Sequence, residues 1–114
     1  MKDMAKKLAN VLVNYSLGVK PDWEVAINTT PLAEPLIKEI LKEVLKAKAH
    51  PKTNIHIDSC TPIFIENSND EQLTHVFQTS LLEAKTIDAR IGINATTDTN
   101  AINITTSANI SLMT

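Results

Sequence analysis

Apolar residues near the start of the chain recur every three or four positions, which is the spacing of one helix face. The members of this face are Met4, Ala5, Leu8, Ala9, Val11, Leu12 and Tyr15. Asp3 is suited to cap such a helix. Gly18 is suited to end it, because glycine takes the left-handed conformation at a helix exit without a steric penalty. The pattern predicts a first helix that stops at Gly18.

After a predicted turn at residues 19–22, the spacing of apolar residues changes from helical to alternating. Trp23, Val25 and Ile27 then share one face, and β-branched and aromatic residues are preferred in strands. This alternation predicts a strand over residues 23–28. Two later alternating stretches, 54–58 and 86–93, predict two more strands.

A broad apolar stripe follows the first strand and predicts a helix that packs on a sheet. The first column of the stripe consists of Leu32, Leu36, Ile40 and Val44. The adjacent column consists of Ala33, Ile37, Leu41 and Leu45. Thr30 is suited to cap a helix starting at Pro31, but Pro35 lacks the amide hydrogen that the second turn needs. We therefore expect regular helix from about Ala33 or Glu34. His50–Pro51 is expected to end it, because a residue before proline favours extended backbone.

Two short helices are predicted between the second and third strands, over residues 62–67 and 70–76, with Ser68 or Asn69 as the cap of the latter. The connections between strands are long enough for crossovers, which favour parallel pairing. We therefore predict one α/β domain over residues 1–114. Its sheet is small, open and mostly parallel, with three to four strands flanked by helices.

Composition restricts the function classes. The 114 residues are 43% apolar and 21% charged, which is ordinary for a globular domain. The net charge is −2 without a basic block, so nucleic acid is not an expected partner. No apolar run approaches the ~20 residues of a membrane span, so no membrane partner is expected. Because the N-terminal residues do not have the pattern of a secretory signal peptide, we expect a cytoplasmic protein.

The first candidate site is the strand-to-helix junction Asn28–Pro31, where backbone amides at a helix start are placed to hold phosphate. The junction lacks the glycines of a nucleotide-binding loop. A loop that caps the following helix is the favoured interpretation.

A second candidate is a metal site. Asn54, His56 and Asp58 point to one side of the predicted strand, with Cys60 two residues further. Two-residue spacing is weak evidence, and a solvent-facing stripe on an edge strand is the favoured alternative.

The remaining candidates also have ordinary explanations. The histidines are His50, His56 and His75, and Cys60 is interpreted as a structural thiol at a strand end. Glu66, Asp70 and Glu71 form an acidic cluster that helix starts favour through the macrodipole. We assign no catalytic, cofactor-binding or metal-binding residue.

Several stretches together resemble the opening domain of the aminopeptidase T family of metallo-aminopeptidases. They are Asn14–Pro21, Leu32–Leu36, Ala47–Pro51, Asn69–Leu73 and Ala89–Ile91. The resemblance implies a parent enzyme with two divalent metal ions, zinc or cobalt, that activate water and polarise the scissile carbonyl. It also implies that the metal ligands lie in a larger C-terminal catalytic domain.

On that basis we expect this chain to be the non-catalytic N-terminal part, inactive alone and without a cofactor of its own. Its implied partners are the C-terminal catalytic domain and a second subunit, since the family forms dimers. The alternative is a stand-alone interaction or self-association module without enzymatic activity.

The chain departs from the family pattern at two turns. Pro21–Glu24 stands where similar proteins have Pro-Gly-Asp, and Lys48 replaces a glycine. Both are positions that glycine suits because of positive φ. Near the end, alternation at residues 102–104 favours a strand, whereas the resemblance implies a short helix, a turn and another helix beginning near Ser107. The pattern leaves both open.

Overall fold

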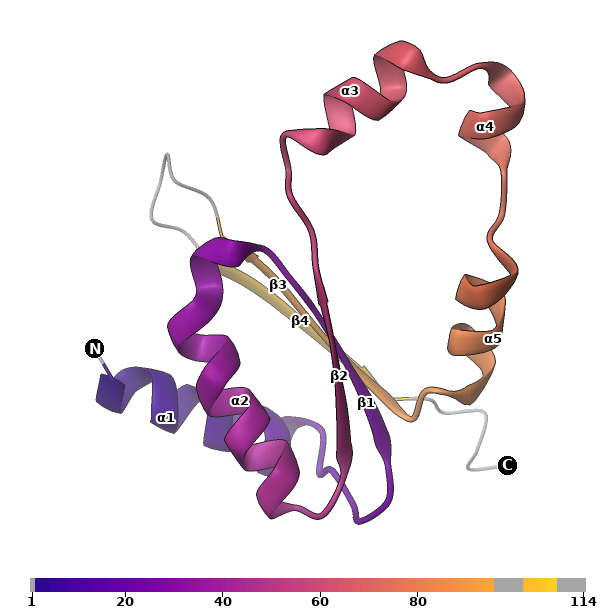
Figure 1. The fold of residues 1–114 in the computed structure, drawn as a ribbon. Helices are drawn as coiled ribbons and strands as arrows, with labels where there is room; N and C mark the ends of the chain where they lie inside the picture. Colours follow the sequence, from indigo (N-terminus) through magenta and orange to yellow (C-terminus); the bar gives the residue numbers. More distant parts are fainter. Residues whose placement is uncertain (1, 96–101, 109–114) are drawn as a thin grey trace.

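The structure is a computed structural model that describes residues 2–95 and 102–108 (Figure 1). Its strands form one open sheet in the order β2-β1-β3-β4. Their bounds are β1 Glu24–Thr29, β2 His50–Ile55, β3 Ala89–Ala95 and β4 Ile102–Ala108. β1 pairs in parallel with β2 and β3, and β3 pairs antiparallel with β4. The predicted α/β class and the small, mostly parallel sheet are confirmed.

Helices cover one face of this sheet. α1 (Lys2–Asn10) continues as the π-helix η1 (Val11–Ser16), and the 3-10 turn η2 (Pro31–Ala33) leads into α2 (Glu34–Lys46). Figure 1 shows α1 and α2 on the same side of the sheet. We call these elements and the four strands the body.

The core lies between the two helices and the sheet. Val25 and Ile27 of β1 and Ile91 of β3 are completely buried, as are Ile40 and Val44 of α2. The rest of the cluster consists of Ala9, Leu12, Val13, Ala33, Leu36, Ile37, Ala49, Ala89, Ile93 and Ala95. The α2 stripe therefore packs on the sheet as its apolar columns predict.

The opposite face of the sheet is polar. Successive strand residues point to opposite faces, so the residues between the core positions share this second face. They include Lys52, Asn54, Asn28, Arg90, Asn94, Asn103, Thr105 and Ser107. The side chain of Asn54 donates to Oδ1 of Asn28 at 2.9 Å. This face is therefore suited to water.

Residues 56–86, which we call the arm, leave the C-terminal end of β2 and return at the start of β3. The arm contains three short helices, α3 (Cys60–Asn67), α4 (Asp70–Thr74) and α5 (Gln78–Thr86). Figure 1 shows it arching away on the side of the sheet remote from α1 and α2. None of the three helices contains a buried residue.

Several predicted helix boundaries need correction. The first helix already includes Asp3, which is therefore not its cap, and it changes to π-helix at Val11. Gly18 has φ +58°, as expected of a helix exit. α2 begins at Glu34 as predicted, but it ends at Lys46, before His50. Thr30 makes no side-chain capping hydrogen bond.

The later boundaries show why short apolar stretches are ambiguous. The second strand is confirmed, but the bounds predicted for it, 54–58, are wrong, because β2 begins at His50 and ends at Ile55. α3 and α4 match the predicted short helices, and Asn69 is the cap of α4. α5 was not predicted, and Thr86 belongs to it instead of to the third strand. β4 confirms the strand alternative at 102–104 and includes Ser107; residues 96–101 and 109–114 lie outside the described ones.

Both turns without the family glycine keep a left-handed backbone. Asp22 has φ 68° and Lys48 has φ 65°. The backbone amide of Asp22 donates to the carbonyl of Lys48 at 2.9 Å, so the two turns are bonded to each other. Such a conformation costs an L-residue about 1–2 kcal/mol. The body maintains this geometry even though neither position is glycine.

Candidate functional site

The residues predicted as a metal-binding stripe do not continue one strand. β2 ends at Ile55, and the amide of His56 still donates to the carbonyl of Thr29 at 2.8 Å. The chain then turns, and Cys60 begins α3. His56, Asp58 and Cys60 are all exposed. The prediction that they share a strand face is therefore wrong.

The junction Asn28–Pro31 joins two strands of the body. The Thr30 hydroxyl donates to the carbonyl of Ala95 at 3.1 Å and accepts from the Ala95 amide at 3.1 Å. The Thr29 hydroxyl donates to the Thr30 carbonyl, and both threonines are buried. The Thr30 hydroxyl therefore connects the segment that follows β1 to the end of β3. The role supported here is structural, although it differs from the predicted helix cap.

The three histidines lie on separate segments. Nε2 of His50 is 3.6 Å from Oδ1 of Asp22, and both side chains are exposed. The ring of His75 contacts the ring of Phe77 edge to face, with centroids 5.0 Å apart. His56 occupies the turn after β2. The structure does not bring them together.

The predicted acidic cluster of Glu66, Asp70 and Glu71 is distributed over two helices. Asp70 and Glu71 lie in the first turn of α4, where the helix dipole favours carboxylates. Glu66 lies near the end of α3, so this explanation is wrong for Glu66. Among residues 2–95 and 102–108, no three His, Cys, Asp or Glu side chains form a group that could hold a metal ion.

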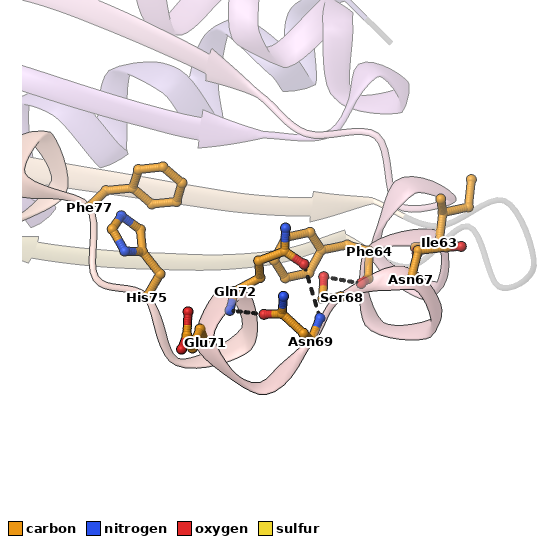
Figure 2. Close-up of a pocket in the computed structure, with 9 residues that line it drawn as sticks. All are labelled: Ile63, Phe64, Asn67, Ser68, Asn69, Glu71, Gln72, His75 and Phe77. Atoms are coloured by element: carbon orange, nitrogen blue, oxygen red, sulfur yellow. Dashed lines mark hydrogen bonds between the residues drawn. The ribbon is translucent and has the colours of Figure 1, made fainter.

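An open hollow of about 650 Å³ lies between α3 and α4 (Figure 2). It is lined by Ile63, Phe64, Asn67, Ser68, Asn69, Glu71, Gln72, His75 and Phe77. The Asn69 side chain accepts from the Gln72 amide at 2.8 Å, and the Gln72 side chain accepts from the Asn69 amide at 3.0 Å. This reciprocal cap fixes the start of α4. The hollow offers an apolar wall, with Glu71 and His75 as its titratable groups.

The carboxylate of Glu43, in the body, accepts hydrogen bonds from three side chains. The side-chain amides of Asn10 and Asn14 each donate to Oε1 of Glu43 at 3.1 Å, and Nζ of Lys46 lies 3.2 Å from Oε2. Burial raises the pKa of Glu43, but the hydrogen bonds and the charge of Lys46 outweigh it and hold the pKa below its usual value. This cluster joins the first helical segment to α2, so its role is structural.

The fold defines an α/β domain, and its candidate residues are spread over separate elements. A comparison with protein families matches residues 1–114 to the thermophilic metalloproteases of the M29 peptidase family. The chain belongs to this family, and the resemblance to aminopeptidase T is thereby confirmed. A search of curated proteins found no match.

A metalloprotease family implies dependence on a metal ion. The side chains in the described part of the chain do not fit such an ion, because no suitable group of ligands forms there. We therefore derive no hydrolytic step from them. In the same part of the chain, no helix is both long and apolar enough to cross a membrane.

The apolar side chains of the arm are a feature that was not predicted from the sequence. Ile63, Phe64 and Ile65 follow one another in α3 and are 52–60% exposed. The available signal was this uninterrupted run, because a helix that is apolar on all sides is typical of an enclosed segment.

Proposed function

We propose that this chain is the non-catalytic N-terminal domain of a cytoplasmic, metal-dependent aminopeptidase. The observation that carries the proposal is the family match over residues 1–114. The geometry supports a scaffold role, because the ordered polar contacts at Thr30 and Glu43 connect elements of the body. In this proposal the hydrolytic centre belongs to a C-terminal catalytic domain.

An assay with leucine p-nitroanilide tests the first part of the proposal. We expect the purified chain to release no p-nitroaniline above the blank, with or without added Co²⁺ or Zn²⁺. Circular dichroism shows that the sample is folded, and an active metallo-aminopeptidase in the same buffer validates the assay. Metal-dependent turnover that a chelator abolishes would overturn the proposal.

The scaffold role is tested with a separately produced catalytic domain of an M29 enzyme. Mixing it with the present chain should raise its thermal unfolding midpoint, because a ligand that binds only the folded state stabilises it. An unrelated α/β domain of similar size is the control. An unchanged midpoint at saturating concentrations would count against the catalytic domain as a partner.

The second candidate function is an interaction module without enzymatic activity. The apolar side chains exposed along the arm favour it, because exposed apolar surface of this kind marks sites of association. Light scattering over a dilution series tests this function. A strictly monomeric chain at every concentration would contradict it.

A further inference from the structure

The two edges of the sheet differ in how they are protected. β2 and β4 are the outer strands, and among the described residues each of them pairs with one neighbouring strand. Unpaired backbone groups at a sheet edge bond readily to another chain, and proteins block such edges with proline or charged residues. β2 contains Pro51 and Lys52, whereas β4, with the sequence Ile-Asn-Ile-Thr-Thr-Ser-Ala, contains neither a proline nor a charged residue. β4 is therefore the less protected edge.

The position of Pro51 makes the protection of β2 effective. The backbone amides of His50 and His56 donate to the carbonyls of Trp23 and Thr29, at 2.7 and 2.8 Å. Residues along a strand direct their backbone groups alternately to its two sides, so the even-numbered residues of β2 bond to β1 and the odd-numbered ones point outward. Pro51 therefore removes a hydrogen-bond donor from the outer edge.

The same alternation identifies the outward backbone groups of β4. Both backbone groups of Ala95 bond to the hydroxyl of Thr30, which follows β1, so the odd-numbered residues of β3 point to β1. The even-numbered residues of β3 therefore bond to their partners in β4, which are Asn103, Thr105 and Ser107. The backbone groups that remain for the outer edge are those of Ile102, Ile104, Thr106 and Ala108.

The side chains of β4 define what an added strand must contain. The outward-pointing residues have their side chains on the core face of the sheet, because they pair with the buried residues of β3. Ile104 packs against the core, but Ile102 is 50% exposed. The residues between them belong to the polar face. An added strand that continues both faces must therefore alternate apolar residues, which cover Ile102 and Ile104, with polar residues that stay in water.

We propose that the outer edge of β4 binds an extended segment of another polypeptide, in which apolar and polar residues alternate. In this mode of recognition the main-chain hydrogen bonds supply the affinity, and the alternate side chains supply the selectivity. Binding at β4 goes beyond the scaffold role proposed above and does not depend on it.

A second copy of the chain is a poorer occupant of this edge. Full-length antiparallel pairing of two β4 strands sets Ile102 opposite Ala108. It also sets Ile104 opposite Thr106. Each isoleucine then meets a small or polar side chain. A peptide with alternating residues places an apolar side chain opposite both isoleucines, which is the more favourable cross-strand pair.

The probe is a synthetic peptide with the sequence of β3, acetylated and amidated at its ends, because β3 already has the alternation that β4 accepts. Isothermal titration calorimetry measures its binding to the whole chain. A control peptide has the same composition with its apolar residues placed together. The β3 peptide should bind at least roughly tenfold more tightly than the control. Absence of binding at about 1 mM peptide, or equal binding of both peptides, would overturn the proposal.

Two matched proline variants test which edge the peptide uses. Thr106 of β4 and Thr53 of β2 both have amides that point outward, so proline at either position removes no hydrogen bond within the sheet. Thr106→Pro should weaken binding of the β3 peptide roughly tenfold or more, and Thr53→Pro should leave it unchanged. Circular dichroism checks that both variants fold. A folded Thr106→Pro variant that binds like the wild type would sink the assignment to β4.

A second pair of variants tests the side-chain contact without altering the backbone. Ile102 and Ile55 are 50% and 58% exposed on the two edge strands. Ile102→Lys should weaken binding of the β3 peptide, because it places a charge beside the apolar side chains of the peptide. Ile55→Lys is the control and should have no effect. The opposite order would assign the peptide to β2.

Two N-methylated forms of the peptide test the main-chain hydrogen bonds. One form carries the methyl groups on the amides of its two isoleucines, and the other carries them on the amides of its arginine and asparagine. Only alternate amides of an added strand point to β4. One form should therefore bind at least roughly tenfold more weakly than the other. Equal binding of the two forms would contradict strand addition.

Sedimentation equilibrium without peptide tests the second copy as the occupant. We expect Thr106→Pro to leave the oligomeric state of the chain unchanged. Self-association that this variant abolishes would show that β4 pairs with another copy, and it would overturn the alternating peptide as the occupant.

Discussion

The body and the arm both contain large apolar side chains, but those of the body are buried and those of the arm are exposed. In the body, Ile27, Ile40 and Ile91 are completely buried between helices and sheet. In the arm, Ile63 and Ile65 are more than half exposed, although they too lie in regular secondary structure. The difference shows that apolar side chains stabilise a fold only when a second surface is present to cover them.

The arm's helices are stabilised by local contacts. Asn69 and Gln72 cap α4 reciprocally, and the hydroxyls of Thr74 and Thr86 donate to carbonyls four residues earlier. The body is joined by contacts between residues distant in sequence, such as Thr30 with Ala95. Local bonds give marginal helices, whereas distant contacts make unfolding cooperative.

The largest expected contrast comes from removing equivalent side chains in the two regions. Ile40→Ala should lower the free energy of unfolding by about 2–5 kcal/mol, because it leaves a cavity in the core. Ile65→Ala in the arm should change it by less than about 0.5 kcal/mol. Urea unfolding at a dilution where the chain is monomeric measures both. Equal losses would mean that the arm packs within its own chain.

A smaller difference in the free energy of unfolding is expected between variants of Thr30 in the body and Thr74 in the arm. Thr30→Val removes the hydroxyl that bonds to both backbone groups of Ala95, and it should cost about 1–3 kcal/mol because those groups are buried. Thr74→Val removes a hydroxyl that bonds to the Asp70 carbonyl on the exposed α4, and should cost less than about 0.5 kcal/mol. Thermal unfolding of the two variants tests the order. A larger loss at Thr74 would contradict the division between distant and local contacts.

The smallest effect concerns pH and the contact between helices of the body. The folded-state pKa of Glu43 is lower than its usual value, so its contribution to stability is present above the unfolded-state pKa. That contribution is lost as pH falls through the folded-state pKa. Glu43→Gln should cost about 1 kcal/mol at neutral pH and reduce the loss of stability in acid.

Urea unfolding between neutral and acidic pH measures this effect. Glu34→Gln is the matched control, because Glu34 pairs with Lys38 at 3.4 Å on the exposed face of the same helix. Such surface pairs are worth about 0–1 kcal/mol. An acid dependence that is the same in Glu43→Gln and in the wild type would contradict the assignment.

The sequence was most informative where periodicity and burial agree. The two apolar columns of α2 and the alternation of β1 led to the correct elements, and Pro35 placed the start of α2 at Glu34. β2 was misplaced because Pro51 was interpreted as a helix end, whereas it lies in an edge strand that needs no amide hydrogen on its outer side. The turn at Lys48, which ends the helix earlier, has no glycine to mark it.

The arm and the candidate sites were less predictable for a related reason. α5 has Leu81 and Leu82 side by side, without the spacing that marks one packed face. The grouping of His56, Asp58 and Cys60 depended on a strand continuing past Ile55, and only the fold shows that it ends there. Residues brought together by long-range contacts, such as Thr30 and Ala95, leave no pattern in a single sequence.

The hydrogen bond between Asp22 and Lys48 makes the two left-handed turns interdependent. A substitution that relaxes one turn also alters the bond that positions the other, so the effects of changing both residues should not be additive. The turns that lead into β1 and β2 therefore form one structural unit, and the residues allowed at Asp22 depend on the residue at Lys48.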